Sequence, residues 1–118
     1  MKLLFSIAAS SVISGSLLAA DQAKARPFIY VNSWAYNGSA LQCIENVEPV
    51  LSKLKFENFD SQQTDDKRAA KITGYHEKEY VTVEIECDQK LGITVIGVAG
   101  IDNDLTYEIY SKLRKAQW

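Results

Sequence analysis

The chain has 118 residues, of which 47% are hydrophobic, and a formal net charge of −2. This length suits one small domain. The slightly acidic balance argues against a nucleic-acid partner and against a polybasic membrane patch, because both need clustered Lys and Arg. The one basic group near the C-terminus, Lys112, Arg114 and Lys115, is better interpreted as complementing the end of a helix.

Residues 1–20 have the layout of a secretory signal peptide. Lys2 gives a positive start, an apolar run of small residues follows, and Ala19-Ala20 offers a cleavage site. Cleavage after Ala25 is a second option, because the A-K-A triplet that ends there fits the same rule. A retained membrane anchor is the alternative, but serines and a glycine interrupt the run. We therefore expect an exported protein, periplasmic or secreted, whose residues 21–118 form a single domain.

The first element expected in the mature chain is a strand over residues 28–36, which are rich in strand formers. Small or aliphatic side chains alternate there with a mostly aromatic set. That set would form one face of the strand and comprises Phe28, Tyr30, Asn32, Trp34 and Tyr36. The turn dipeptide Asn37-Gly38 then ends the strand.

A helix follows from Ser39, which fits the N-cap of a capping box with Gln42. Apolar residues recur at helical spacing and define one face: Ala40, Cys43, Ile44, Val47, Leu51 and Leu54. Pro49 lies inside this pattern, where proline removes a backbone donor and clashes with the preceding turn. We therefore expect a kink there, or two short helices.

The stretch from Glu57 to about Lys71 is polar and predicts a long solvated loop. Its acidic residues lack the alternating ligand pattern of a calcium loop, so no metal site is expected. A short strand over residues 71–75 and a polar turn over residues 76–79 follow.

Two further strands and a helix complete the pattern. Residues 80–87 alternate strictly between apolar and polar side chains, and residues 91–100 are apolar on both faces, as in a central strand. Asp102, Asn103 and Asp104 offer N-caps for a last helix, whose apolar stripe comprises Leu105, Ile109 and Leu113.

The order strand, helix, three strands, helix predicts a two-layer α+β sandwich. A four-stranded, mainly antiparallel sheet would carry both helices on one face, against the side of the third strand that bears Val81, Val83, Ile85 and Cys87. Cys43 and Cys87 would then both face the interior.

In an oxidising compartment, two cysteines predict one disulfide, Cys43–Cys87. It would close a loop of about 45 residues and contribute on the order of 4 kcal/mol in the chain-entropy model. A redox-active pair, a metal site and an intermolecular bridge are the alternatives. The chain lacks C-x-x-C spacing and has one histidine, His76, which disfavours the first two.

These elements resemble a group of small exported bacterial proteins of the cell envelope. That group shares a leader, a cysteine in the first helix, a strand ending in I-x-C, a strand ending in V-A-G and a final helix. The corresponding residues here are Cys43, Ile85-Glu86-Cys87 and Val98-Ala99-Gly100. The group has no assigned activity, so the resemblance supports the fold and the disulfide and implies no chemistry.

The search for chemistry yields no catalytic set. His76 falls in the expected polar turn, and no nucleophile, phosphate-binding or zinc motif is present. Glu84 and Glu86 would lie on one strand face, roughly 7 Å apart, which leaves a hydrolase open as an alternative. A thiol oxidoreductase using the two cysteines is the other enzymatic alternative. We expect no enzyme, no cofactor and no metal.

The expectation for function is a small non-enzymatic interaction module. The sheet face opposite the helices would carry the aromatic set and the polar side of the strand over residues 80–87. Tyr and Trp among polar groups suit recognition surfaces. A protein or glycan partner in the envelope is expected there; the alternative is that these rings cover the sheet or pack in a homodimer. The candidate binding residues are Tyr30, Asn32, Trp34, Tyr36, Tyr80, Thr82 and Glu84.

Overall fold

The computed structural model describes residues 26–116 and 118. The expected leader and both expected cleavage sites lie outside these residues. The elements are β1 (Phe28–Ala35), α2 (Ala40–Lys53), β2 (Phe56–Gln63), β3 (Ala69–His76), β4 (Val81–Asp88), β5 (Ile93–Gly100) and α3 (Asn103–Ala116).

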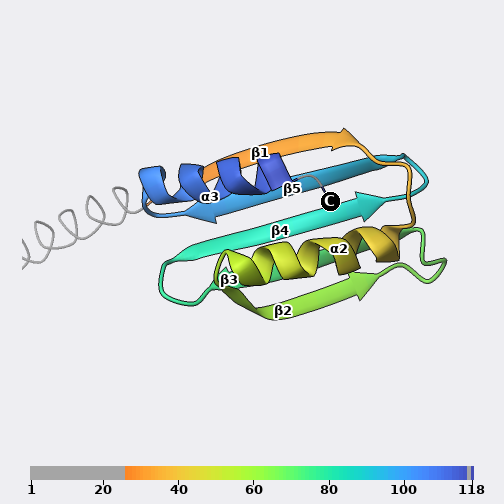
Figure 1. Ribbon diagram of the computed structural model, residues 1–118, viewed down its shortest axis with the longest axis horizontal. Coiled ribbons are helices and arrows are strands. Elements are labelled where there is room, and N and C mark those ends of the chain that lie inside the picture. The colour runs from red at the N-terminus through yellow and green to blue at the C-terminus, as the bar shows by residue number, and fades with distance from the viewer. Residues whose placement is uncertain (1–25, 117) are drawn as a thin grey trace, which may run out of the picture.

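The strands form one five-stranded antiparallel sheet in the order β1-β5-β4-β3-β2 (Figure 1). Strands β2 to β5 follow one another as a meander of neighbours, which needs only short turns. Strand β1 lies at the opposite edge, beside β5, so α2 carries the chain from one edge of the sheet to the other. The two edge strands are therefore β1 and β2.

Both helices cover the same face of the sheet. Helix α2 packs on β2, β3 and β4, and α3 packs on β5 and β1 (Figure 1). The core between the layers takes alternate residues from the strands and one stripe from each helix, as expected for a two-layer domain. Its largest fully buried apolar side chains are Leu51, Ile72, Ile85, Ile96, Leu113, Val47, Val83 and Val98.

The expected four-stranded sheet is wrong, because the stretch that reads as a long loop contains β2. Within β2 only Phe56 is buried and Phe59 is half-buried, while the other side chains are mainly exposed. An edge strand is hydrogen-bonded on one side only, so it needs few apolar residues. A break in register between Glu57 and Asp60, with Asn58 at φ 54°, also disturbs the alternation.

Of the two outcomes expected at Pro49, two short helices is wrong, since α2 runs as one helix across it. Pro49 is exposed, so the carbonyl that loses its partner lies on the solvent side of the helix. The predicted start of α2 is confirmed: Ser39 is the N-cap, and its hydroxyl oxygen accepts from the Gln42 amide at 3.1 Å.

The apolar pattern of the last helix is confirmed in part. Ile109 and Leu113 are buried and Leu105 is half-buried, while Thr106 is buried without having been expected there. Asp102 caps this helix, because its carboxylate accepts from the Leu105 amide at 2.9 Å. Helix α3 is thereby fixed over β5 and β1.

Candidate functional site: the open face of the sheet

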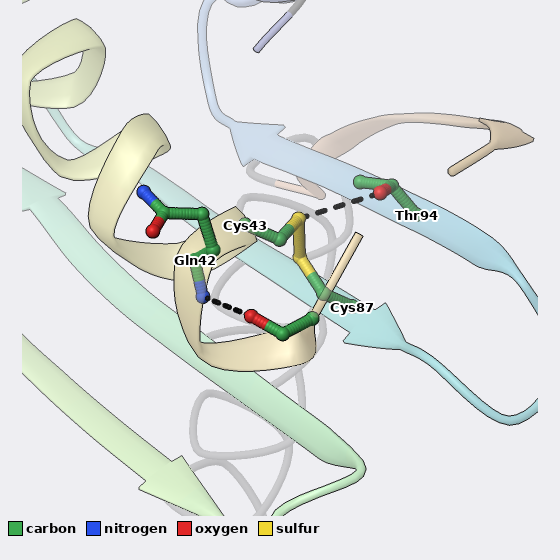
Figure 2. Close-up of a disulfide and its surroundings, with 5 residues drawn as sticks. Gln42, Cys43, Cys87 and Thr94 are labelled. Carbon is green, nitrogen blue, oxygen red and sulfur yellow. Dashed lines mark hydrogen bonds between the residues drawn. A yellow bond between two sulfur atoms is a disulfide. The ribbon is translucent and has the colours of Figure 1, made fainter. Parts of the chain in front are cut away.

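The predicted disulfide is confirmed. Cys43 from α2 and Cys87 from β4 are joined at 2.02 Å between sulfurs, with 6.3 Å between their Cα atoms (Figure 2). The two residues are 0% and 1% exposed, and the sulfur of Cys43 lies 3.4 Å from the Thr94 hydroxyl. An attacking thiolate has to reach a sulfur for disulfide exchange, so this burial favours a structural clamp over redox chemistry.

The candidate residues on β1 lie on the helix-covered face, contrary to their expected position. Tyr30 pairs with Val98 in the sheet, and Val98 is fully buried under the helices. The Tyr30 ring stacks on Tyr110 of α3 at 5.4 Å between centroids and meets Tyr107 edge-on at 5.3 Å. The Tyr30 hydroxyl also donates to the Asn103 side chain.

The same holds for the rest of the aromatic set on β1. Trp34 packs edge-on against Trp118, with 5.1 Å between ring centroids, and Asn32 shares its side of the strand. Tyr36, just beyond β1, packs against the core. The physical reason is space: α3 alone covers two strands at the edge of the sheet, and wide rings fill the margin that aliphatic side chains would leave open.

The candidate residues near β4 remain accessible. Tyr80 is 81% exposed and precedes β4, while Thr82 is half-buried and Glu84 is exposed on the uncovered side of the strand. The predicted set is therefore divided between two faces and does not form one binding surface.

The uncovered face of the sheet, here called the open face, has two chemically different bands. In the rows of cross-strand partners, polar residues predominate on β2, β3 and β4 and apolar residues predominate on β5 and β1, where Ser33 is an exception. One row is Asp60, Thr73, Glu84, Gly97 and Val31. The apolar band, on β5 and β1, comprises Ile93, Val95, Ala99, Ile29, Val31 and Ala35. The acidic band, on β4, β3 and β2, comprises Glu84, Glu86, Asp88, Glu57 and Asp60 with one basic residue, Lys71.

The apolar band is exposed mostly along β1, where Ile29 is 64% and Val31 is 62% exposed. On β5 its side chains are half-buried by their neighbours. Exposed aliphatic residues that adjoin on one sheet surface form a patch, and such patches mark interaction sites more often than single exposed residues do.

The two bands meet in an open hollow of about 350 Å³ at one end of the sheet. Its apolar side comes from the start of β5 and the turn before it, and its polar side from β2, β3 and β4. Its lining includes Leu91, Ile93 and Val95 on the apolar side and Gln62, Lys71 and Glu86 on the polar side. This hollow can hold a side chain that has both an aliphatic stem and a charged end.

The residues considered for catalysis are not assembled into a site. Glu84 lies 3.7 Å from Lys71, with half of its side chain exposed, while Glu86 lines the hollow. His76 ends β3, and its Nδ1 accepts from the amides of Lys78 and Glu79 at 3.3 and 3.2 Å, which assigns it a role in the turn. Among residues 26–116 and 118, no cluster of three His, Cys, Asp or Glu suited to a metal is found.

The sequence reasoning missed the apolar band, although its signal was present. Residues 93–99 are apolar on both faces, which requires apolar neighbours on the uncovered side as well. Ile29 and Val31 are those neighbours on β1. In the part of the chain that the structure describes, neither helix has the length and apolar character needed to cross a bilayer.

Comparison with known proteins adds no relative: no protein-family model, no curated protein and no solved structure matches the chain.

Proposed function

We propose that this chain is a small exported, non-enzymatic interaction module that binds a protein partner through its open face. The single observation that carries the proposal is the open face itself, on which an apolar band runs beside an acidic band. The buried disulfide supports work in an oxidising compartment, periplasmic or outside the cell, because such bonds persist there.

The chemistry of the two bands defines the partner. Five carboxylates accompany one basic residue, Lys71, on the acidic band, so the partner presents Lys or Arg side chains towards it. Beside them the partner presents apolar groups to the aliphatic side chains of β5 and β1. A cationic protein surface with interspersed apolar residues satisfies both requirements.

This arrangement of the aromatic rings does not support a glycan partner. That interpretation relied on Tyr30, Trp34 and Tyr36 as a stacking platform, and the structure turns these rings towards α3 and the core. Of the aromatic residues predicted to bind, Tyr80 remains freely accessible, and it precedes β4. A protein partner is therefore the proposal, and a glycan partner is an outcome that the experiment can reveal.

The test reverses charge on the acidic band. Glu84→Lys with Glu86→Lys should abolish capture of the partner from native envelope extract, because opposite charges become like charges across the interface. Both side chains are exposed or line the hollow, and the ion pair of Glu84 with Lys71 is surface-exposed, so the fold should tolerate the change. The measurement is mass spectrometry of captured proteins at low and at high salt.

The matched control is Glu45→Lys with Glu48→Lys. It makes the same charge change on exposed positions of α2, in the opposite layer. Wild type and control should capture the same cationic protein, and the open-face variant should lose it at least tenfold. Equal capture by all three proteins would contradict the proposal, as would a captured polysaccharide in place of a protein.

A further inference from the structure

The free edge of β1 differs from an ordinary edge strand because nothing in it discourages pairing. Its eight residues contain no charge and no proline, and their register with β5 is unbroken. An exposed edge of this kind is a template for another strand, and proteins normally protect edges with charges, bulges or proline. The other edge, β2, has both a charge at Glu57 and at Asp60 and a break in register between them.

The backbone groups that β1 offers can be identified. The Tyr36 amide donates to the Gly92 carbonyl at 2.9 Å, which continues the β1–β5 register by one position. Because hydrogen-bonded pairs alternate along an antiparallel ladder, even-numbered residues of β1 bond to β5 and odd-numbered residues point to the free edge. Ile29 and Val31 therefore present their amides and carbonyls outward.

Two neighbouring positions limit the register of an added strand. The outward amide of Ser33 is already occupied, because the Asn32 side chain accepts from it at 2.8 Å. Pro27, just before β1, has no amide hydrogen to donate. In an antiparallel pairing of two copies centred on Tyr30, Pro27 of one copy lies opposite Ser33 of the other, so the two positions without a free amide donor coincide. Ile29 then lies opposite Val31, and these are the two most exposed large apolar residues of β1.

Helix α3 extends the same surface. It lies over both β5 and β1 (Figure 1), and Tyr107, half-exposed, packs there on Tyr30. The Arg114 guanidinium lies over the Tyr110 ring, 5.9 Å from its centroid. Tyr and Arg are enriched in interfaces.

The spacing of the layers fits a second copy. Neighbouring strands lie about 4.8 Å apart, and in each copy α3 lies over β5 and β1. Two copies paired through β1 would thus place their α3 helices about 10 Å apart, which is the distance at which helices pack. The β1 strands of the two copies and their α3 helices would then be in contact at the same time. A stable interface takes roughly 800 Å² from each partner, so it requires the flank of α3 in addition to the strand edge.

We propose that the occupant of the β1 edge is a second copy of this chain, paired antiparallel around Tyr30. The two sheets become one, and the apolar bands of both copies join across the two-fold axis. The edge carries no charge, so identical copies do not repel each other there. This inference does not rest on the proposed open-face partner, because it needs only the free backbone and the flank of α3.

The test places charges on both exposed residues of the edge. In the proposed register, residue 29 of one copy faces residue 31 of the other. Ile29→Lys with Val31→Lys sets like charges opposite each other twice, whereas Ile29→Lys with Val31→Glu sets opposite charges there. The exported, mature protein is measured by sedimentation velocity over a range of concentrations, and circular dichroism checks that each variant is folded.

Wild type should be a dimer at about 100 µM, in the affinity range of small interfaces. The Lys/Lys variant should raise the dissociation constant at least tenfold, and the Lys/Glu variant should remain dimeric. The control Leu41→Lys with Tyr75→Lys replaces two exposed residues on α2 and β3, away from the β1 edge, and should also remain dimeric. A monomeric wild type at every concentration would overturn the proposal, and so would a Lys/Lys variant that dimerises like wild type. A folded Lys/Glu variant that is monomeric would overturn the register centred on Tyr30.

Discussion

The two halves of the molecule are stabilised in different ways. In the α2 half, which comprises α2 with β2, β3 and β4, a buried disulfide fastens the helix to the sheet, and the edge strand is polar with a broken register. In the α3 half, which comprises α3 with β5 and β1, the helix is held by ring packing and a close approach to the sheet. Its edge strand is uncharged and regular.

This difference separates stability from recognition. The α2 half closes its edge with charged and polar side chains and fixes its helix covalently, and it contributes the acidic band to the open face. The α3 half carries the apolar band, the accessible strand edge and the half-exposed tyrosines on one side of the molecule. Both proposals made above therefore depend on the α3 half, with the acidic band of the α2 half supplying charge.

The largest expected effect comes from removing the covalent link of the α2 half. Cys43→Ala with Cys87→Ala should lower the free energy of unfolding by about 4 kcal/mol, because a closed loop of this length restricts the unfolded chain. Urea denaturation measures the loss. Hydrogen exchange should show that amides of α2 lose protection before those of α3, since α2 alone loses its clamp.

The control for this prediction is Thr94→Val. It removes the hydroxyl that lies 3.4 Å from the Cys43 sulfur and leaves the disulfide and the packed volume in place. It should cost no more than about 1 kcal/mol, the net value of one ordinary hydrogen bond. A double cysteine variant that loses less than this control would show that the disulfide is not the main fastening of the α2 half.

A smaller effect is expected at the closest approach of α3 to the sheet. A Cβ added at Gly100 would collide with the Thr106 hydroxyl and lie 3.0 Å from Cγ2 of Val81. Gly100→Ala should therefore cost about 1–3 kcal/mol, as overpacking of a tight core does. Thermal denaturation gives the measurement.

Gly97 is the matched control, since it lies on the same strand but on the open face. A Cβ there would meet only the Glu84 carbonyl, at 3.9 Å, which is ordinary contact. Gly97→Ala should leave the stability unchanged or slightly raised, because alanine restricts the unfolded chain more than glycine does. Equal losses for both variants would mean that α3 does not pack closely on β5.

The sequence predicts the well-patterned parts of the fold. The alternation of Val81, Val83, Ile85 and Cys87, the stripe of α2 and the pairing of the cysteines follow from burial, and all of these are confirmed. Each of these segments has one clearly apolar face, so periodicity is enough to orient it. The leader, the export and the resemblance to small exported bacterial proteins stay predictions.

The edges of the sheet could not be predicted in this way. On β2, one buried residue, Phe56, leaves no alternation to detect. On β1 both faces are apolar, so alternation is visible but does not say which set faces the helices. The aromatic set faces inward because α3 leaves a wide margin at that edge. This depends on the position of a helix whose first residue, Asn103, is 73 positions from Tyr30 in the chain. For this reason the prediction that the aromatic set lies on the uncovered face is wrong.

The smallest expected effect concerns the turn that joins β2 to β3 at the β2 edge of the sheet. The Thr64 hydroxyl donates to the Asp66 carboxylate at 2.7 Å and the Arg68 amide donates to it at 3.1 Å. These bonds, the first above all, lower the pKa of Asp66 below its ordinary value of 3.8. Asp66→Asn should therefore lower the stability at neutral pH slightly, by less than Gly100→Ala does.

The pH dependence gives this prediction its sign. A pKa lowered in the folded state means that the ionised carboxylate favours folding, so its contribution is complete above the ordinary value of 3.8. It is lost as the pH falls through the lower value of the folded protein, and wild type and Asp66→Asn should then converge in melting temperature. Asp65→Asn removes a neighbouring carboxylate that accepts neither bond, and its difference from wild type should be smaller at neutral pH. Equal effects of the two substitutions would show that the stability depends on local charge alone and not on the hydrogen bonds that Asp66 accepts in the turn.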